Sequence, residues 1–458
     1  MKRRSFLKNM GLGAVGMAMP QLPWAETRTA GKPNIIVIMA DDLGYADVGF
    51  TGGKDIPTPN IDSIAGSGVR FTNGFVSHPY CSPSRAGLLT GRYQHRFGHE
   101  CNPAYDFNNP KLGIPVRETL LSDVLQKAGY ITGAIGKWHL GVTKAFHPNQ
   151  RGFNEFYGFL HGIHNYMRSV PCGKAILDPL LRNKKPQSHP GYLTDVFSYE
   201  AADFIRRHRD KPFFLYLSYS AVHTPLQAPA KYLARFKNIP EKKRRIYTAM
   251  AAAMDDGIGQ VLSALRHYNL ENDTLVFFLS DNGGDLNWGA SNHPLRGGKS
   301  SLYEGGIRVP FAVQWPGKLP GGKVYDHQVI SLDIFATAAA AAGAELPADR
   351  EYDGVDLVPF LLGKKQDHPQ EQLFWRVDNG LSYAVREDRY KLVGDKKTEK
   401  KELFDLAADP RESRDLSREK PKEVQRLSLA YKKWQSKMIP PLWPNQWEYF
   451  KKKKQSIS

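Results

Sequence analysis

The amino-acid sequence predicts an α/β fold, in which a large, mostly parallel sheet is flanked by helices and a small antiparallel sheet with one helix follows. Three observations predict it. Strand-length apolar runs alternate with helix-like segments over most of the chain. Most of these runs are continuous rather than alternating, as expected for strands that are covered on both faces. After about residue 365, the pattern changes to short strand-like runs joined by polar turns.

The main sheet is predicted from five apolar runs that have the length of strands. Helix-like segments separate them, and strands interleaved with helices favour crossover connections and parallel pairing. The runs are residues 35–39, 131–135, 213–217, 275–279 and 309–313, and the helix-like segments are residues 118–128, 196–208, 246–268 and 334–342.

The C-terminal part is predicted to be a separate small unit. Strand-like runs and one helix-like stretch follow one another there, which indicates an antiparallel sheet with a helix packed beside it. We therefore predict a catalytic domain at 31–365, a small subdomain at 366–450 and a disordered basic tail at 451–458. The runs in the subdomain are residues 372–377, 382–386 and 390–393, and its helix-like stretch is residues 422–437.

The first 25 residues have the features of an export signal. A basic head that contains Arg3 and Arg4 precedes a short apolar stretch at 10–19. The arginine pair resembles a twin-arginine signal, so the export machinery of that type is an expected partner. The apolar stretch is too short to span a membrane, although a basic amphipathic anchor is an open alternative. We expect a periplasmic or secreted bacterial protein with no stable membrane anchor.

Composition narrows the class of partner. The chain has 458 residues, 41% of them hydrophobic, which is enough for one large core and a smaller unit. Its formal charge of +17 suits an anionic substrate, but runs of lysine and arginine are more often solvated surface than binding sites. No nucleic-acid-binding motif is present, so we expect no nucleic-acid partner. Three cysteines are too few for a disulfide framework, and Cys101 and Cys172 are either free or paired.

Charged, amide and imidazole side chains follow four of the five predicted strands directly. In open α/β sheets, ligands bind beyond the carboxyl ends of the strands, so these side chains are expected to form a single site. The residues are Asp41 and Asp42 after the first run, Lys137 and His139 after the second, His223 after the third, and Asp281 and Asn282 after the fourth.

The strongest local motif begins at Cys81 and reads Cys-Ser-Pro-Ser-Arg, continuing to Arg92. Pro83 suits the first turn of a helix, and Cys81 and Arg85 then lie one turn apart on the same face. A helix N-terminus favours a bound anion. The whole stretch resembles the signature of formylglycine-dependent type I sulfatases, and the resemblance continues over residues 33–410. It is nearest to bacterial polysaccharide sulfatases and to arylsulfatase and N-acetylgalactosamine-6-sulfatase-like enzymes.

The resemblance implies an alkaline-phosphatase-like fold and two cofactors. Cys81 would be oxidised to formylglycine by a formylglycine-generating maturation enzyme. The four strand-end residues with side-chain oxygens, together with the modified cysteine, would bind one calcium ion. All-oxygen ligation suits a hard divalent ion, and calcium and magnesium are not distinguished by the residues alone. The implied metal ligands are Asp41, Asp42, Cys81, Asp281 and Asn282.

The resemblance also implies roles for the remaining site residues. Arg85 and the cation would hold the sulfate, and Asp281 would accept a proton from the formylglycine hydrate. His223 and Lys299 would assist the departing alcohol, and His139 would deprotonate the second hydroxyl so that sulfate is expelled. Lys137 would orient the hydrate. The implied catalytic residues are Cys81, Arg85, Lys137, His139, His223 and Lys299.

The expected substrate is a sulfated glycan, such as an algal galactan or a glycosaminoglycan. Export, a basic surface and the similarity to polysaccharide sulfatases favour it. Loops at 95–105, 159–168 and 285–296 are candidates for specificity because loops over the strand ends contact substrates. The sugar, the sulfate position and exo or endo action stay open. Alternatives are a phosphate or phosphonate ester hydrolase of the same superfamily and a non-catalytic relative that binds sulfated glycans.

Overall fold

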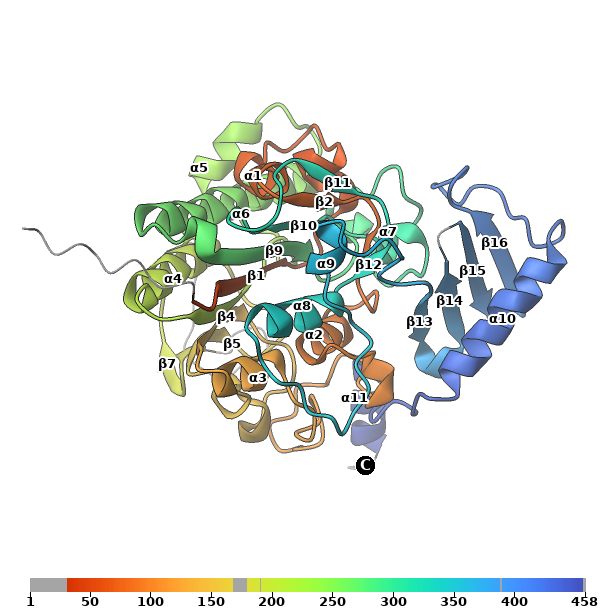
Figure 1. Ribbon diagram of the computed structural model, residues 1–458. Helices are drawn as coiled ribbons and strands as arrows, with labels where there is room; N and C mark the ends of the chain where they lie inside the picture. The colour runs from red at the N-terminus through yellow and green to blue at the C-terminus, as the bar shows by residue number, and fades with distance from the viewer. Residues whose placement is uncertain (1–30, 168–178, 190, 388, 456–458) are drawn as a thin grey trace, which may run out of the picture. The chain divides into compact units, whose positions relative to one another are not determined.

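A ten-stranded mixed sheet forms the centre of the computed structural model, which describes residues 31–167, 179–189, 191–387 and 389–455 (Figure 1). The strand order is β11-β2-β10-β9-β1-β8-β4-β5-β6-β7. The five strands from β9 to β5 pair in parallel, which confirms the predicted parallel sheet. They are β9 (Thr274–Ser280), β1 (Asn34–Ala40), β8 (Phe213–Ser218), β4 (Ile131–Lys137) and β5 (Glu155–Phe159).

The outer strands of this sheet are mostly antiparallel. The run predicted at 309–313 is β10 (Phe311–Gln314), which pairs antiparallel with both β9 and β2. At the other side, β6 and β7 pair antiparallel. The remaining outer strands are β2 (Val69–Phe71), β11 (Lys323–Tyr325), β6 (Leu180–Arg182) and β7 (Lys185–Gln187), and β3 (Gly74–Phe75) pairs with β12 (Val329–Ile330) outside this sheet.

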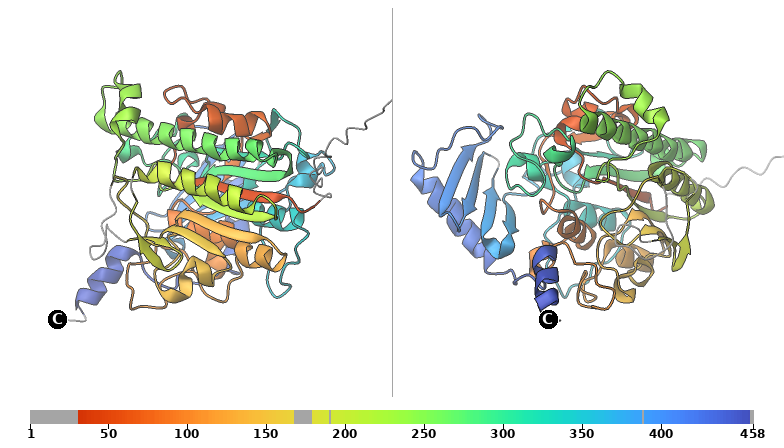
Figure 2. Two further views of the ribbon diagram at one scale, coloured as in Figure 1. Left: turned by 90° about the vertical axis from the view of Figure 1, so that its left-hand side faces the viewer. Right: turned by 180° about the vertical axis from the view of Figure 1, so that it is seen from behind.

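Helices cover both faces of the main sheet, as Figures 1 and 2 show. Along β1, Ile35 and Val37 belong to one hydrophobic core, and Ile36 and Ile38 belong to the other. Burial on both faces explains why the strands read as continuous apolar runs. Helices α2 (Cys81–Thr90), α3 (Leu121–Lys127) and α8 (Asp333–Ala341) supply the first core, and α1 (Pro59–Gly66), α4 (Leu193–His208) and α6 (Lys242–His267) supply the second.

An antiparallel sheet with helix α10 (Pro421–Gln435) follows, as predicted, but it has a fourth strand, at residues 400–405, that was not predicted. The rings of Tyr431 on α10 and Tyr383 on β14 stack at a centroid distance of 4.0 Å, and Trp434 joins the same core. The strands are β13 (Leu373–Val377), β14 (Ser382–Arg386), β15 (Tyr390–Asp395) and β16 (Lys400–Asp405); shorter helices elsewhere are α5 (Ala230–Leu233), α7 (Glu304–Ile307) and α9 (Val358–Leu361).

The basic tail differs from the prediction. Residues 451–455 belong to helix α11 (Gln446–Gln455), so the expectation of disorder from residue 451 is wrong for them. Lys453 Nζ donates to Asp106 Oδ2 at 2.5 Å, and this ion pair holds the end of the chain on the preceding fold. The predicted export signal and Cys172 lie outside the described residues. Within the described part of the chain, no helix is long and apolar enough to cross a membrane.

Candidate active site

The four parallel strand ends bring their polar side chains to one place, as predicted. The backbone links the ends directly: the Asp281 N–H donates to Ala40 O at 3.0 Å, and the Asp41 N–H donates to Ala221 O at 2.9 Å. Asp41 and Asp42 follow β1, Asp281 and Asn282 follow β9, and Lys137 is the last residue of β4. Parallel strands that lie side by side place these groups at the same edge of the sheet.

Helix α2 begins at Cys81, as the proline in its first turn predicts, and all of its residues are buried. Cys81 Sγ donates to Asp41 Oδ1 at 3.6 Å. Burial raises the pKa of the Cys81 thiol, so the unmodified side chain is protonated at neutral pH.

Arg85 lies one turn after Cys81 and is completely buried. Its Nε and Nη2 atoms donate to Asp281 Oδ2 at 2.9 and 2.7 Å. Its Nη1 atom donates to the Lys137 carbonyl at 3.2 Å and to the Ser218 hydroxyl. These hydrogen bonds hold the guanidinium rigidly. Asp41 Oδ2 also lies near it, 3.7 Å from Nη2.

Two lysines and a histidine surround the first acidic pair. Lys137 Nζ lies 2.5 Å from Asp41 Oδ2, and Lys299 Nζ lies 2.7 Å from Asp42 Oδ2. His223 Nε2 lies 3.7 Å from the same Asp42 oxygen. Burial and the nearby Asp281 carboxylate raise the pKa of Asp41 to about 7. Burial also acts to raise the pKa of Asp42, but Lys299 and His223 outweigh it and hold that pKa below its usual value.

The acidic pair has the donor chemistry of a metal site. One ligand atom from each of Asp41, Asp42, Cys81 and His223 lies within 4.8 Å of the others. Asn282 Oδ1 is buried and has no hydrogen-bond partner among the described residues, while its Nδ2 donates to Asp42 Oδ1 at 2.7 Å. Carboxylates with an unused amide oxygen fit a hard divalent cation, and rotation of the Asn282 amide would turn that oxygen towards Asp42.

The metal-ligand set predicted from the sequence differs in part from this cluster. His223 lies within it, although the sequence assigned it only to the leaving-group side. Asp281 is engaged elsewhere: Oδ2 accepts from Arg85, and Oδ1 accepts from the Asp42 N–H at 3.3 Å. The structure thus brings all predicted site residues to one edge but shows Asp281 as the partner of Arg85.

His139 is positioned by contacts that sequence reasoning did not predict. Its φ of 60° is in the left-handed region, and both ring nitrogens are buried without a hydrogen-bond partner among the described residues. Burial, with Lys137 and Arg85 nearby, lowers its pKa well below the usual value, so the ring is neutral. The Ser82 hydroxyl donates to the His139 carbonyl at 2.6 Å and is also 2.7 Å from His99 Nε2.

The predicted specificity loops differ in their surroundings. In the loop at 159–168, His161 stacks on Tyr105, whose ring also stacks towards His139. In the loop at 285–296, the Lys243 ammonium lies over the Trp288 ring, 4.7 Å from the ring centroid. The Trp288 side chain is partly exposed. His99 and Tyr105 belong to the predicted specificity loop at 95–105, and Ser82 belongs to the Cys81 motif, but no spacing signal links these three residues to His139.

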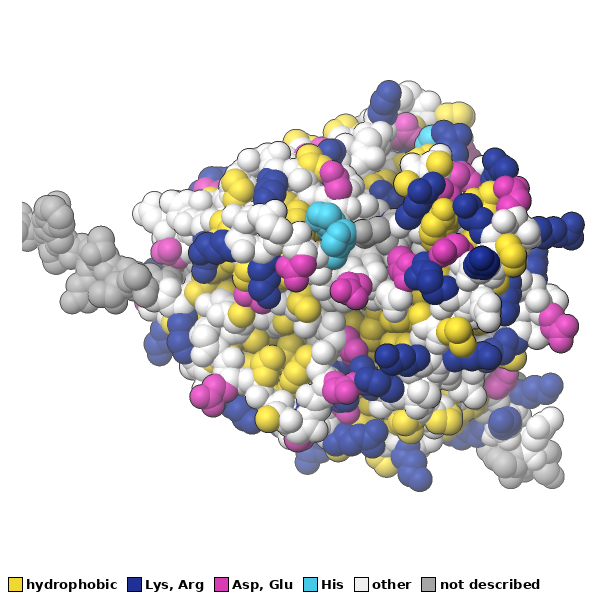
Figure 3. All heavy atoms as spheres, turned by 45° about the vertical axis from the view of Figure 1, so that its right-hand side comes forward, with side chains coloured by type: hydrophobic (Ala, Val, Ile, Leu, Met, Phe, Trp, Pro, Cys, Tyr) yellow, Lys and Arg dark blue, Asp and Glu magenta, His cyan; other side chains and the backbone are white. Residues whose placement is uncertain are grey.

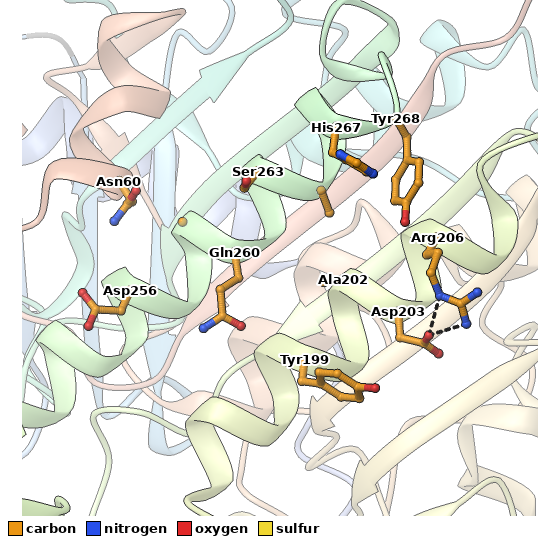
Figure 4. A pocket seen from close by; sticks show the side chains of 12 residues that line it. Asn60, Tyr199, Ala202, Asp203, Arg206, Asp256, Gln260, Ser263, His267 and Tyr268 are labelled. Carbon is orange, nitrogen blue, oxygen red and sulfur yellow. Dashed lines mark hydrogen bonds and ion pairs between the residues drawn. The ribbon is translucent and has the colours of Figure 1, made fainter. Parts of the chain in front are cut away.

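A separate cavity of about 750 Å³ opens between α4 and α6 (Figure 4). Tyr199, Gln260 and His267 line it, and an ion pair between Asp203 and Arg206 lies on its wall. None of the predicted site residues lines this cavity. It is therefore distinct from the site at the strand ends.

Comparison with known proteins agrees with this geometry. The sulfatase family profile matches residues 33–344, and the profile of the C-terminal region of N-sulphoglucosamine sulphohydrolase matches residues 298–437. Human N-acetylgalactosamine-6-sulfatase is 37% identical over 383 residues, which cover 78% of this chain and 69% of that protein. Human steryl-sulfatase is 34% identical over 451 residues, which cover 79% and 75%.

Among solved structures, Ps i-CgsB in complex with k-i-k-neocarrahexaose is similar, with a TM-score of 0.86 and 39% identity. The match covers 90% of this chain and 94% of that one. The large mixed sheet with flanking helices and the small antiparallel sheet thus form the expected alkaline-phosphatase-like fold. The chain belongs to the sulfatase family and is a sulfuric ester hydrolase.

Proposed function

We propose that this protein removes sulfate from a sulfated carbohydrate, using formylglycine made from Cys81 and one bound calcium ion. The observation that carries the proposal is the start of α2, where Cys81 lies 3.6 Å from Asp41 and one turn from the buried Arg85. The similarity to a protein solved with a neocarrahexaose favours a carrageenan-type galactan as the substrate. The similarity to N-acetylgalactosamine-6-sulfatase keeps glycosaminoglycan sulfate as the second substrate class.

The side chains divide into a buried floor and a more open rim. Cys81, Arg85 and Lys137 are buried, whereas the side chains of His223 and Lys299 are 17% and 15% exposed. A sulfate bound against the floor would direct its alcohol towards the rim. Lys299 Nζ is therefore suited to donate a proton or a hydrogen bond to the departing alcohol oxygen. His223 Nε2 would donate there when the ring is protonated, because Nδ1 already donates to the Thr224 carbonyl at 2.7 Å.

The floor residues bind charge and move protons. Arg85 stabilises negative charge on the sulfate oxygens, and Asp281 holds Arg85 in place. Asp281 Oδ1 has only a 3.3 Å hydrogen bond from the Asp42 amide, which leaves it able to accept a proton from the nucleophile. The neutral His139 ring has two unused nitrogens and accepts the second proton.

The two proposed cofactors complete this chemistry. Formylglycine supplies a hydrated aldehyde, one hydroxyl of which is the nucleophile at sulfur. Residue 81 with Asp41, Asp42, Asp281 and Asn282 would hold the calcium ion, which would supply positive charge to the sulfate oxygens. The Lys137 ammonium forms an ion pair with Asp41, with 2.5 Å between Nζ and Oδ2, and keeps that carboxylate oriented.

The activity is tested by comparing an aryl sulfate with the aryl phosphate that has the same leaving group. We expect turnover of the sulfate to dominate. Dominant phosphatase turnover would instead assign the chain to phosphate ester hydrolysis, which the same fold and nucleophile can support. Sulfate release from carrageenan and from chondroitin sulfate oligosaccharides, followed by ion chromatography, then separates the two carbohydrate classes.

Export to the bacterial periplasm is the proposed location. The arginine pair Arg3-Arg4 supports it, because twin-arginine signals are read by their own export machinery. Such export carries folded proteins, so Cys81 would be oxidised in the cytoplasm before folding. Replacing both arginines by lysine should leave the protein in the cytoplasmic fraction; unchanged periplasmic recovery would exclude this route.

A further inference from the structure

Helix α11 lies beyond the residues that the two family profiles match, which end at residue 437. It is the last element among the described residues, and Figure 1 shows it beside the segment that follows α2. Its sequence has four consecutive lysines and only one acid, Glu448. The helix is therefore a basic addition, and its two faces differ in what they contact.

One face of α11 is fixed to the loop at 101–109. Gln446 Nε2 donates to the Pro103 carbonyl at 2.9 Å. Tyr449 Oη donates to Asp106 Oδ2 at 2.8 Å, and Lys453 Nζ donates to the same oxygen at 2.5 Å. The anchoring residues recur three and four positions apart, which places them on one side of the helix.

The loop that holds α11 also contacts the active site. Asn102 Oδ1 accepts a hydrogen bond from the Ser82 N–H at 3.0 Å, next to Cys81. Tyr105 accepts a hydrogen bond from the Gly162 N–H at 2.6 Å, and its ring stacks towards His139. The helix is thus separated from the catalytic centre by a single loop.

The opposite face of α11 exposes an aromatic ring among lysines. Trp447 is 89% exposed, more than any other large hydrophobic side chain in the described residues, and Phe450 is 39% exposed. Lys451 and Lys452 are also exposed, and Lys451 lies one helical turn after Trp447. The exposed tryptophan ring presents a large, flat apolar area on which another flat apolar surface can stack.

We propose that the outward face of α11 binds the sulfated polysaccharide chain at a distance from the sulfate that is hydrolysed. Trp447 stacks on the apolar face of a sugar ring, and Lys451 and Lys452 contact sulfate groups. This inference rests on the proposed sulfated-carbohydrate substrate. It adds a second attachment point for a long polyanion, which raises the effective concentration of its sulfates at the active site.

Charge and geometry favour a polysaccharide over an anionic membrane surface. A helix that binds a lipid surface needs a wide apolar face. The outward side of α11 has only two exposed apolar side chains, Trp447 and Phe450, and the exposed Glu448 lies there with the lysines. Its other face is already fixed to the loop beside the active site.

The test compares full-length variants on two substrates, polymeric ι-carrageenan and a small aryl sulfate. For Trp447→Ala, and for Lys451→Gln with Lys452→Gln, we expect kcat/KM on the polymer to fall about tenfold relative to that on the aryl sulfate. The loss should appear in KM, and for the lysine variant it should shrink at high salt. Lys432→Gln with Lys433→Gln on α10 is the matched control and should leave the ratio unchanged.

A binding measurement separates this inference from the proposed function. Cys81→Ala, alone and combined with Trp447→Ala, is run through gels that contain ι-carrageenan or neutral agarose. Carrageenan should retard the single variant more than the double variant, whether or not the enzyme hydrolyses this polymer. Equal retardation, or an equal loss on both substrates in the kinetic test, would overturn the inference. Loss of binding to phosphatidylserine vesicles without any change on carrageenan would assign the face to membranes instead.

Discussion

At the residue scale, Cys81 lies among the buried charged side chains of the active site. It begins a fully buried helix, and Asp41 and Arg85 lie around it. The Cys81→Ala variant should lose turnover of aryl sulfates completely, because the nucleophile is gone. Its thermal unfolding should change little, since the substitution removes one sulfur atom at a cost of about 1 kcal/mol. Retained turnover in the folded variant would contradict the role of Cys81.

Substitution of Arg85 tests whether its guanidinium neutralises the buried Asp281 carboxylate, as the structure shows. The Arg85→Met variant leaves Asp281 as an unpaired buried charge, which should destabilise the protein by about 3–5 kcal/mol. The double variant Arg85→Met with Asp281→Asn should recover part of that stability but no activity. Urea unfolding and aryl sulfate turnover measure the two effects separately. Stability that does not recover in the double variant would show that the pair with Asp281 is not the main interaction of Arg85.

Lys299 tests the assignment of the rim to the leaving group. The Lys299→Met variant should lose more activity on sulfates of poor leaving groups than on those of acidic phenols, because only poor leaving groups need assistance. The measurement is kcat/KM for a series of aryl sulfates with different phenol pKa values. The exposed Lys397 supplies the control, Lys397→Met. A uniform loss across the series would instead indicate a role for Lys299 in holding the sulfate.

At the scale of elements, buried ion pairs hold the segment that carries Lys299 against the small sheet. Lys391 on β15 is fully buried between Glu304 at 3.0 Å and Glu412 at 2.9 Å. Glu304 begins α7, five residues after Lys299, and Arg386 on β14 also contacts it at 3.1 Å. The small sheet therefore fixes α7 by buried charge as well as by packing.

The corresponding prediction concerns Lys391→Met. Removing this ammonium leaves two facing carboxylates without their shared partner, so unfolding in urea should become easier by about 3–5 kcal/mol. Adding Glu412→Gln should restore part of the loss. The lysine at position 401, exposed on β16, provides the control Lys401→Met. Equal stability of the Lys391 and Lys401 variants would contradict the role of Lys391 in holding α7 against the small sheet.

The elements differ in how far the sequence predicts them. Four of the five parallel strands (β9, β1, β8 and β4) and the long helices were predictable because each buries many residues with a regular pattern. Strand β5 was not predicted, since its five residues include a charged residue, Glu155, and a glycine, Gly158. The direction of β10 was not, since an apolar run reads the same for either orientation. Strands of three residues such as β2 and β11 are too short to show a period. Helix α11 was missed because a run of lysines suggests solvent, whereas here Asp106 pairs with Lys453.

The active-site residues also differ in how far the sequence predicts their positions. Motif residues such as Cys81 and Asp281 were predictable because each directly follows a strand or begins a helix. The place of His223 within the metal cluster was not, since it depends on how the segment after β8 turns towards Asp42. The link from His99 through Ser82 to His139 depends on tertiary contacts that leave no spacing signal.

At the scale of the whole molecule, the face drawn in Figure 3 has its charges distributed rather than gathered. Figure 3 shows lysine and arginine side chains interspersed with acidic ones over the face that it presents. The excess positive charge of the sequence is thus mostly solvated surface on this face, as its lysine and arginine runs predict. A general attraction for polyanions follows, while specificity rests on local features such as Trp447.

Calcium should stabilise the whole fold, because the proposed ligands come from segments far apart in the sequence. A ligand that binds only the folded state adds about 2.7 kcal/mol at a hundredfold excess over its dissociation constant. Thermal unfolding with and without calcium measures this gain, and a chelator should reverse it. The Asp42→Asn variant should show little of the gain. An equal gain in that variant would place the ion elsewhere.

The central claim is that Cys81 is the precursor of the nucleophile. Mass spectrometry of the peptide that spans residue 81, from active enzyme made in a host with the maturation machinery, tests it most directly. The peptide should be lighter than the unmodified one, because one sulfur and two hydrogens are replaced by one oxygen. A peptide with an intact thiol in fully active enzyme would contradict the claim.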